Sequence, residues 1–276
     1  MLRYLTILRS QNHPWLFLIS RLLMRTGLSK RLFIPQGGFR LRFYPSSLSA
    51  SLWIDPEDRK DDVAFLNDYL RVGDTVVDVG ANIGSLSIAS ALCVGASGSV
   101  LAVEPHPRIY GYLLGNLELN SVGNVKPVNT ALGDKTGELW FMDERSDDQN
   151  SVAKEGVGIR VPVTTLDEVA SELGRIALLK IDVEGYEVAM LAGAAEVLSR
   201  TECVYCESYE SHFQKLGWTT GDLIGKFEAA GMQVFSGIKQ RRLVRVRPGY
   251  VSEGCEDLVA LHDPKSIQGR MKCVFA

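Results

Sequence analysis

The stretch Thr75-Val-Val-Asp-Val-Gly-Ala-Asn-Ile-Gly84 decides the fold. An apolar strand ends at Asp78, and Gly80 and Gly84 bracket the turn into a helix predicted over residues 83–92. Glycine lets the backbone approach a ligand closely, and in open parallel sheets ligands bind beyond the carboxyl ends of the strands. The stretch therefore predicts a ligand site at the end of a buried strand.

The same alternation of short apolar strands and helices continues toward the C-terminus. Further strands are predicted at Ser99–Glu104, Val125–Thr130, Ala177–Ile181 and Cys203–Glu207, and helices at Pro107–Asn120, Tyr186–Leu198 and Thr220–Ala230. Such a pattern is typical of a mostly parallel sheet with helices on both faces. We therefore expect an α/β fold, interrupted after its third strand by a β-hairpin insertion whose polar loop spans Asp143–Gly158.

An extension precedes this alternating region. A helix is predicted from Pro14 to Gly27, and a strand pair over Arg31–Tyr44 turns at residues 36–38. We expect residues 1–60 to form a basic N-terminal extension and residues 61–276 to form the ligand-binding domain.

Charge is distributed unevenly between these two parts. The whole chain carries a formal charge of −3, but residues 1–54 contain eight Lys or Arg, two of them Arg3 and Arg9, and no acid, which leaves −11 for the rest. Residues 14–27 either pack over the core with Arg21 and Arg25 in water, or lie on an anionic membrane surface. We find no motif of a nucleic-acid-binding module, so no nucleic-acid partner is expected.

The glycine spacing discriminates between adenosine cofactors. A dinucleotide fingerprint reads GxGxxG, whereas here the spacing is GxxxG with Asp78 two residues before Gly80. A carboxylate there would repel a pyrophosphate but attract the ammonium group of a methionine moiety. Glu104, which ends the next strand, can accept hydrogen bonds from a ribose diol. S-adenosylmethionine is therefore favoured over NAD, and an NAD-dependent oxidoreductase is the alternative.

Acidic residues also follow a later buried strand, in Lys180-Ile-Asp-Val-Glu-Gly185. Asp182 and Glu184 lie two residues apart and share a face of an extended chain, where they suit deprotonation of a hydroxyl acceptor, with a divalent metal held by the pair as the lesser alternative. Asp182 is the first choice as base, with Glu184 or His212 as alternatives, although either acid could instead cap the next helix.

The five cysteines are odd in number and widely spaced, which indicates reduced thiols and a cytoplasmic location, with peripheral contact to the inner face of a membrane as an option. Cys203 and Cys206 would point to opposite faces of a strand, so no metal site is expected. No apolar stretch is long enough to cross a bilayer.

Together these segments resemble the FkbM-type methyltransferase family. The residues that carry the resemblance are Asp78-Val-Gly-Ala-Asn-Ile-Gly84, Glu104-Pro105 with the following helix, Thr130-Ala-Leu-Gly-Asp134, Thr164-Thr-Leu-Asp167 and Lys180-Ile-Asp-Val-Glu-Gly185. The resemblance implies a Rossmann-like class I methyltransferase sheet of seven mostly parallel strands, with the last antiparallel, and S-adenosylmethionine as the methyl donor. By position it assigns the cofactor segment to Asp78, Gly80, Asn82, Gly84, Glu104 and Pro105, and the transfer site to the acidic segment.

The expected function is methyl transfer to a hydroxyl group of a sugar, glycolipid or polyketide-like molecule. A non-catalytic module that binds S-adenosylmethionine is the second alternative. Neither the acceptor nor the oligomeric state follows from the sequence.

Overall fold

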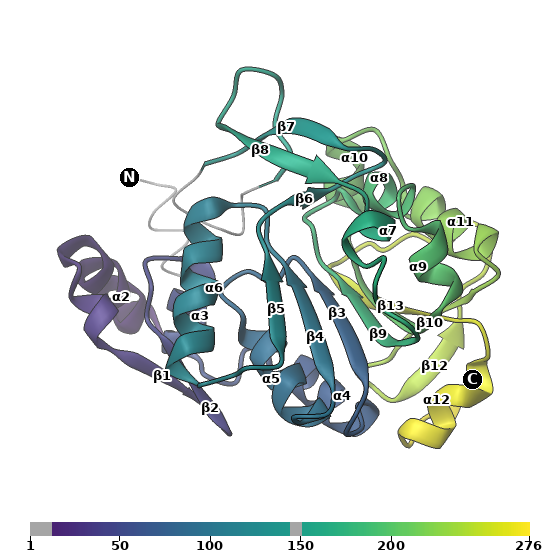
Figure 1. Ribbon diagram of the computed structural model, residues 1–276, viewed down its shortest axis with the longest axis horizontal. Coiled ribbons are helices and arrows are strands. Elements are labelled where there is room, and N and C mark those ends of the chain that lie inside the picture. The colour runs from purple at the N-terminus through teal and green to yellow at the C-terminus, as the bar shows by residue number, and fades with distance from the viewer. Residues whose placement is uncertain (1–12, 144–150) are drawn as a thin grey trace.

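The computed structural model describes residues 13–143 and 151–276, so Arg3, Arg9 and residues 144–150 of the predicted polar loop lie outside the described residues. One mixed sheet of nine strands runs through the molecule, with helices on both faces (Figure 1). Within the described ranges, no helix is long and apolar enough to span a bilayer.

The Rossmann-like prediction is confirmed by the strand order. Seven strands follow one another across the sheet as β5-β4-β3-β9-β10-β13-β11, and β13 is antiparallel to both of its neighbours. Their bounds are Thr75–Val79 for β3, Ser99–Val103 for β4, Val125–Val128 for β5, Ile176–Ile181 for β9, Thr201–Ser208 for β10, Gln233–Ser236 for β11 and Glu256–Leu261 for β13.

The sheet is two strands wider than the seven expected. β12 (Arg242–Arg245) pairs with β11, and β14 (Val274–Phe275) pairs with β12. β12 lies in the basic stretch around residue 242. Leu243 is fully buried in this strand, whereas Arg242 and Arg245 are exposed. One apolar side chain in an alternating strand is enough to fix which face turns inward.

Helices cover both faces of the sheet. α4 (Lys60–Tyr69), α5 (Ser85–Val94) and α12 (Pro264–Arg270) bury side chains in one apolar cluster, whereas α8 (Glu187–Leu191), α9 (Ala195–Ser199) and α11 (Thr220–Ala229) bury theirs in another. Cys203 belongs to the first cluster and Cys206 to the second. The two thiols are free and lie on opposite faces of β10, as predicted.

The predicted helix over Tyr186–Leu198 is wrong as a single element, because it is divided into α8 and α9. A Cβ on Gly193 would lie 2.2 Å from the carbonyl oxygen of Gly133, so the chain passes too close to its neighbour for a continuous helix with a side chain there. Asp167, in the short helix α7 (Leu166–Val169), accepts hydrogen bonds from the backbone amides of Glu196 and Val197 at the start of α9.

The N-terminal extension packs against α5 and α6 (Pro107–Leu119), beside which it lies in Figure 1. It comprises α2 (Pro14–Thr26), β1 (Phe33–Gln36), β2 (Phe39–Arg42) and α3 (Ser47–Ile54). Leu41 and Leu52 share an apolar cluster with Leu113 of α6, and the Asn116 amide side chain accepts from Arg42 N at 2.8 Å. Helix α3, which begins at the Ser46 cap, was not predicted from the sequence.

The predicted insertion follows β5 and forms a small sheet of its own. β7 (Gly137–Phe141) pairs antiparallel with β8 (Ile159–Thr164), and β6 (Ala131–Leu132) joins β8 on the other side. This sheet lies across the top of the view in Figure 1, above β4 and β5.

Candidate active site

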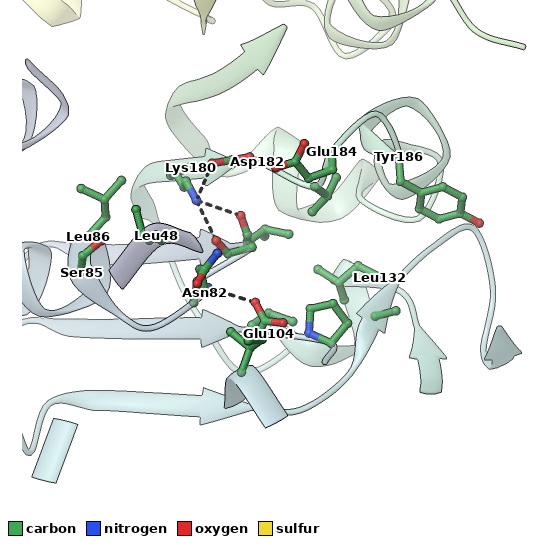
Figure 2. A pocket seen from close by; sticks show the side chains of 18 of the residues that line it. Leu48, Asn82, Ser85, Leu86, Glu104, Leu132, Lys180, Asp182, Glu184 and Tyr186 are labelled. Atoms are coloured by element: carbon green, nitrogen blue, oxygen red, sulfur yellow. Dashed lines mark hydrogen bonds and ion pairs between the residues drawn. The ribbon is translucent and has the colours of Figure 1, made fainter. Parts of the chain in front are cut away.

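A cavity opens at the carboxyl ends of β3, β4 and β9, between the α3 region and the inserted sheet. Its lining includes Gly80, Asn82, Glu104, Pro105, Leu132, Asp182, Glu184 and Tyr186. The extension contributes Ser47, Leu48, Ser51, Asp58 and Arg59. Figure 2 shows Asn82 and Glu104 on one side of this space and Lys180, Asp182 and Glu184 on another. Most of the predicted site residues therefore meet in one place.

The glycine loop is shaped by its neighbours in the fold. Gly80 has a φ of 77°, and a Cβ there would lie 1.8 Å from the carbonyl oxygen of Asp182. Gly84 has a φ of 90°, and its Cβ would lie 2.6 Å from Leu113 Cδ1. Only glycine fits both the left-handed backbone and these close approaches. Gly84 is absent from the cavity lining, so its contact is with α6.

Glu104 connects this loop to the end of β4. Its Oε2 accepts from Asn82 N at 3.0 Å, and its Oε1 accepts from His106 N at 2.8 Å. Glu104 also lines the cavity, and a carboxylate can accept several hydrogen bonds. Such an acceptor fits the hydroxyl groups of an adenosine ribose, and residues 80–82 and Pro105 would flank it.

Asp78 has a different place from the one expected. Its side chain is buried and does not line the cavity. Ser87 Oγ donates to Asp78 Oδ2 at 2.5 Å, and Lys180 Nζ lies 3.2 Å from Asp78 Oδ1. The carboxylate therefore neutralises Lys180 and anchors α5.

Lys180 is the functional residue that the sequence analysis overlooked most plainly. Its buried ammonium donates to Gly80 O at 2.9 Å and lies 3.6 Å from Asp182 Oδ2 (Figure 2). Burial alone would lower the pKa of Lys180, but the charges of Asp78 and Asp182 raise it above its usual value. A lysine inside an otherwise apolar strand was the available signal, because buried lysines are almost always paired.

Arg59 is a second cation that sequence reasoning missed. Its guanidinium lies 3.2 Å from Asp62 Oδ2 and 3.8 Å from Asp182 Oδ2. Burial alone would lower the pKa of Arg59, but the charges of Asp182 and Asp62 raise it. Asp182 is thus held between two cations, one from β9 and one preceding α4.

Glu184 lies at the other end of the acidic segment, next to His212. Glu184 has a φ of 55°, which is unusual for a residue with a side chain, and its Oε2 lies 3.4 Å from His212 Nδ1. Burial is the main cause that lowers the pKa of His212. His212 does not line the cavity and contacts Glu184 from the start of α10 (Glu210–Lys215).

Glu207 completes a small group of potential ligands near this pair. Burial and the charge of Asp182 raise the pKa of Glu207 to about 8. Donor atoms of Glu184, Glu207 and His212 lie within 4.8 Å of one another, which is the geometry of a possible cation site among the described residues. From the sequence no metal site was predicted, and a divalent metal at Asp182 and Glu184 was the lesser alternative to a base.

Comparison with known proteins identifies the family of this chain. The methyltransferase FkbM domain matches residues 78–234, more than half of the chain. The hexuronic acid methyltransferase AglP of Haloferax volcanii is 26% identical over 191 residues, covering 67% of this chain and 77% of that protein. Methyltransferase 1 of Beauveria bassiana is 29% identical over 147 residues, covering 43% of this chain and 57% of that protein.

Solved structures with a similar arrangement include the methyltransferase FkbM from Methylobacillus flagellatus. It has a TM-score of 0.46 and 14% identity, with 77% of this chain and 52% of that chain covered. An S-adenosylmethionine-dependent O-methyltransferase from Thermotoga maritima has a TM-score of 0.43 and 14% identity, with 75% and 64% covered. On the extent of the domain match, this chain belongs to the FkbM family and is an S-adenosylmethionine-dependent methyltransferase.

Proposed function

We propose that the protein methylates a hydroxyl group on a polar small molecule such as a sugar, a glycolipid or a polyketide-like product. The observation that carries this proposal is a group of polar side chains that line part of the cavity, apart from the residues assigned to the cofactor. Asp182, Glu184 and Arg59 line it, and Ser51 and Asp58 extend the polar wall. Such side chains suit an acceptor with several hydroxyl groups, and the name of the Haloferax volcanii relative also points to a sugar.

S-adenosylmethionine supplies an electrophilic methyl group, so the chain must align the acceptor oxygen, exclude water and take up one proton. Alignment in a closed site can contribute on the order of 7–11 kcal/mol to the barrier reduction. In this proposal Glu104 and the 80–82 loop hold the cofactor. The acceptor lies between them and the acidic segment.

Glu184 is a better candidate for the base than Asp182. Two cations, Lys180 and Arg59, lie beside the Asp182 carboxylate, which suits this side chain to orienting the acceptor. Glu184 lines the cavity and contacts His212 on its far side. The bound cofactor would supply the methyl group by cleavage of its carbon–sulfur bond, leaving S-adenosylhomocysteine, and the Glu184 carboxylate would accept the proton that the acceptor hydroxyl loses.

The first test is calorimetric titration with S-adenosylhomocysteine, with NAD in parallel. We expect that S-adenosylhomocysteine binds and that NAD does not. Glu104→Gln should weaken S-adenosylhomocysteine binding roughly 10–100-fold, because hydrogen bonds to charged groups contribute about 1.5–3 kcal/mol. Glu118→Gln, on the exposed side of α6, is the matched control and should bind normally. Binding of NAD alone would instead support the oxidoreductase.

The second test supplies S-adenosylmethionine with an isotopically labelled methyl group and a set of sugars, glycolipids and polyketide-like alcohols. A new O–CH3 resonance would identify the acceptor. With that acceptor, Glu184→Gln should lower kcat by about 10²–10⁴-fold at unchanged S-adenosylhomocysteine affinity. A larger loss of kcat in Asp182→Asn would indicate that Asp182 is the base. Cofactor binding without transfer to any acceptor would favour the non-catalytic module.

A further inference from the structure

The outer face of α2 is apolar and exposed. Trp15, Leu18, Ile19 and Leu22 have exposed fractions of 60%, 49%, 40% and 62%. At the helical repeat these four positions fall within a sector of about 100°. The opposite side of α2 already packs on the body of the protein, since Phe17 and Ser20 are buried. The helix therefore has two apolar faces, and only the inner one has a partner within the described residues.

This exposure is concentrated in one part of the chain. Among residues 13–143 and 151–276, sixteen large apolar side chains are exposed, and seven of them lie between Trp15 and Phe33. Soluble surfaces scatter such residues singly, whereas contiguous apolar patches mark a binding surface.

The charged side chains of the segment that carries this face, residues 13–54, are all basic. No acid precedes Asp55, and within the described ranges none of the basic side chains from Arg21 to Arg42 forms an ion pair. On the helical repeat Arg21 and Arg25 border the apolar sector on one side. In the strand pair, the Arg40 and Arg42 guanidiniums lie over the ring of Phe33, whose side chain is 42% exposed.

We propose that the outer face of α2 docks on an anionic lipid surface. An apolar stripe bordered by arginines is the pattern of helices that lie in the membrane interface, where the apolar side chains enter the acyl boundary and the cations meet lipid phosphates. The absence of acidic residues favours this partner over a protein surface of mixed charge. α2 lies at the edge of the molecule in Figure 1, away from the insertion and the C-terminus.

The test is flotation of the full-length protein with phosphatidylcholine vesicles, with and without phosphatidylglycerol, at low salt. We expect binding to the anionic vesicles only. Leu18→Glu combined with Leu22→Glu should reduce the bound fraction at least about tenfold. Leu92→Glu is the matched control, because Leu92 is a similarly exposed leucine on α5, outside this face, and should leave flotation unchanged.

Three results would overturn the proposal. The first is no flotation with anionic vesicles, and the second is equal flotation of the double variant and the wild type. The third is a wild-type dimer in solution that becomes a monomer in the double variant. Every variant is also titrated with S-adenosylhomocysteine. Unchanged affinity shows that the site is intact, so failure of the membrane proposal is distinguishable from failure of the methyltransferase assignment.

Discussion

Replacing Lys180 with methionine tests how β9 supports the glycine loop. Methionine keeps the length of the side chain but removes the ammonium group that Asp78 Oδ1 approaches at 3.2 Å and that donates to Gly80 O at 2.9 Å. Asp78 is 1% exposed, so water cannot replace the lost cation. The variant leaves a buried carboxylate whose remaining side-chain partner is Ser87.

The expected cost is about 3–5 kcal/mol, which is the usual penalty for removing one member of a buried ion pair. At roughly 2–4 °C per kcal/mol for a protein of this size, the melting temperature should fall by about 6–20 °C. Adding Asp78→Asn to Lys180→Met removes the uncompensated charge. The double variant should therefore be more stable than the single one.

Urea unfolding monitored by tryptophan fluorescence would measure these free energies for the wild type, both single variants and the double variant. Lys126→Met is the matched control, because Lys126 has a 68% exposed side chain and should change stability by less than about 0.5 kcal/mol. S-adenosylhomocysteine affinity should fall in Lys180→Met, since the loop loses a donor to Gly80 O.

The reasoning would be refuted by a cost below about 1 kcal/mol for Lys180→Met, since that would mean the pair is solvated. It would equally be refuted if Asp78→Asn gave no recovery in the Lys180→Met background. Either result would show that the Lys180–Asp78 ion pair does not link β3 and β9 energetically.

Three further predictions follow from local contacts. Gly80→Ala should abolish S-adenosylhomocysteine binding and lower stability, because the new Cβ would meet Asp182 O. Gly111→Ala has open space around it and should instead stabilise α6 by about 0.5–1 kcal/mol. Thermal melts measure the stability of both variants, and titration measures their affinity for S-adenosylhomocysteine. Asp167→Ala should cost about 1 kcal/mol in urea unfolding by removing the cap of α9 while cofactor affinity stays unchanged, and a loss of affinity would contradict a purely structural role. The pKa of Glu207 is raised to about 8 in the folded state, so its ionisation opposes folding increasingly as the pH rises from about 4.5 to about 8. The gain in stability of Glu207→Gln over the wild type should therefore be larger at about pH 8 than at about pH 5, and an equal gain at both would show that Glu207 ionises normally.

The predicted fold depended on signals that are local in the chain. Short apolar runs such as Thr75–Val79 and Ala177–Ile181 have the length of buried strands, and their alternation with helices indicates a parallel sheet. Parallel strands bring their carboxyl ends to one edge, which is why Glu104, Asp182 and Glu184 could be expected to meet. The local signal for α3 was weaker, because its stabilising contacts are with elements distant in the chain.

By itself, then, the sequence determined the sheet, the glycine loop and the identity of the acids at its edge, because strand length, periodicity and glycine spacing act over a few residues. Only the tertiary structure decided how those acids are used. It turned Asp78 away from the cavity toward Lys180, a residue 102 positions later, and it placed Arg59 beside Asp182. Charge pairing depends on which side chains share a buried space, and that is fixed by packing between elements far apart in the chain.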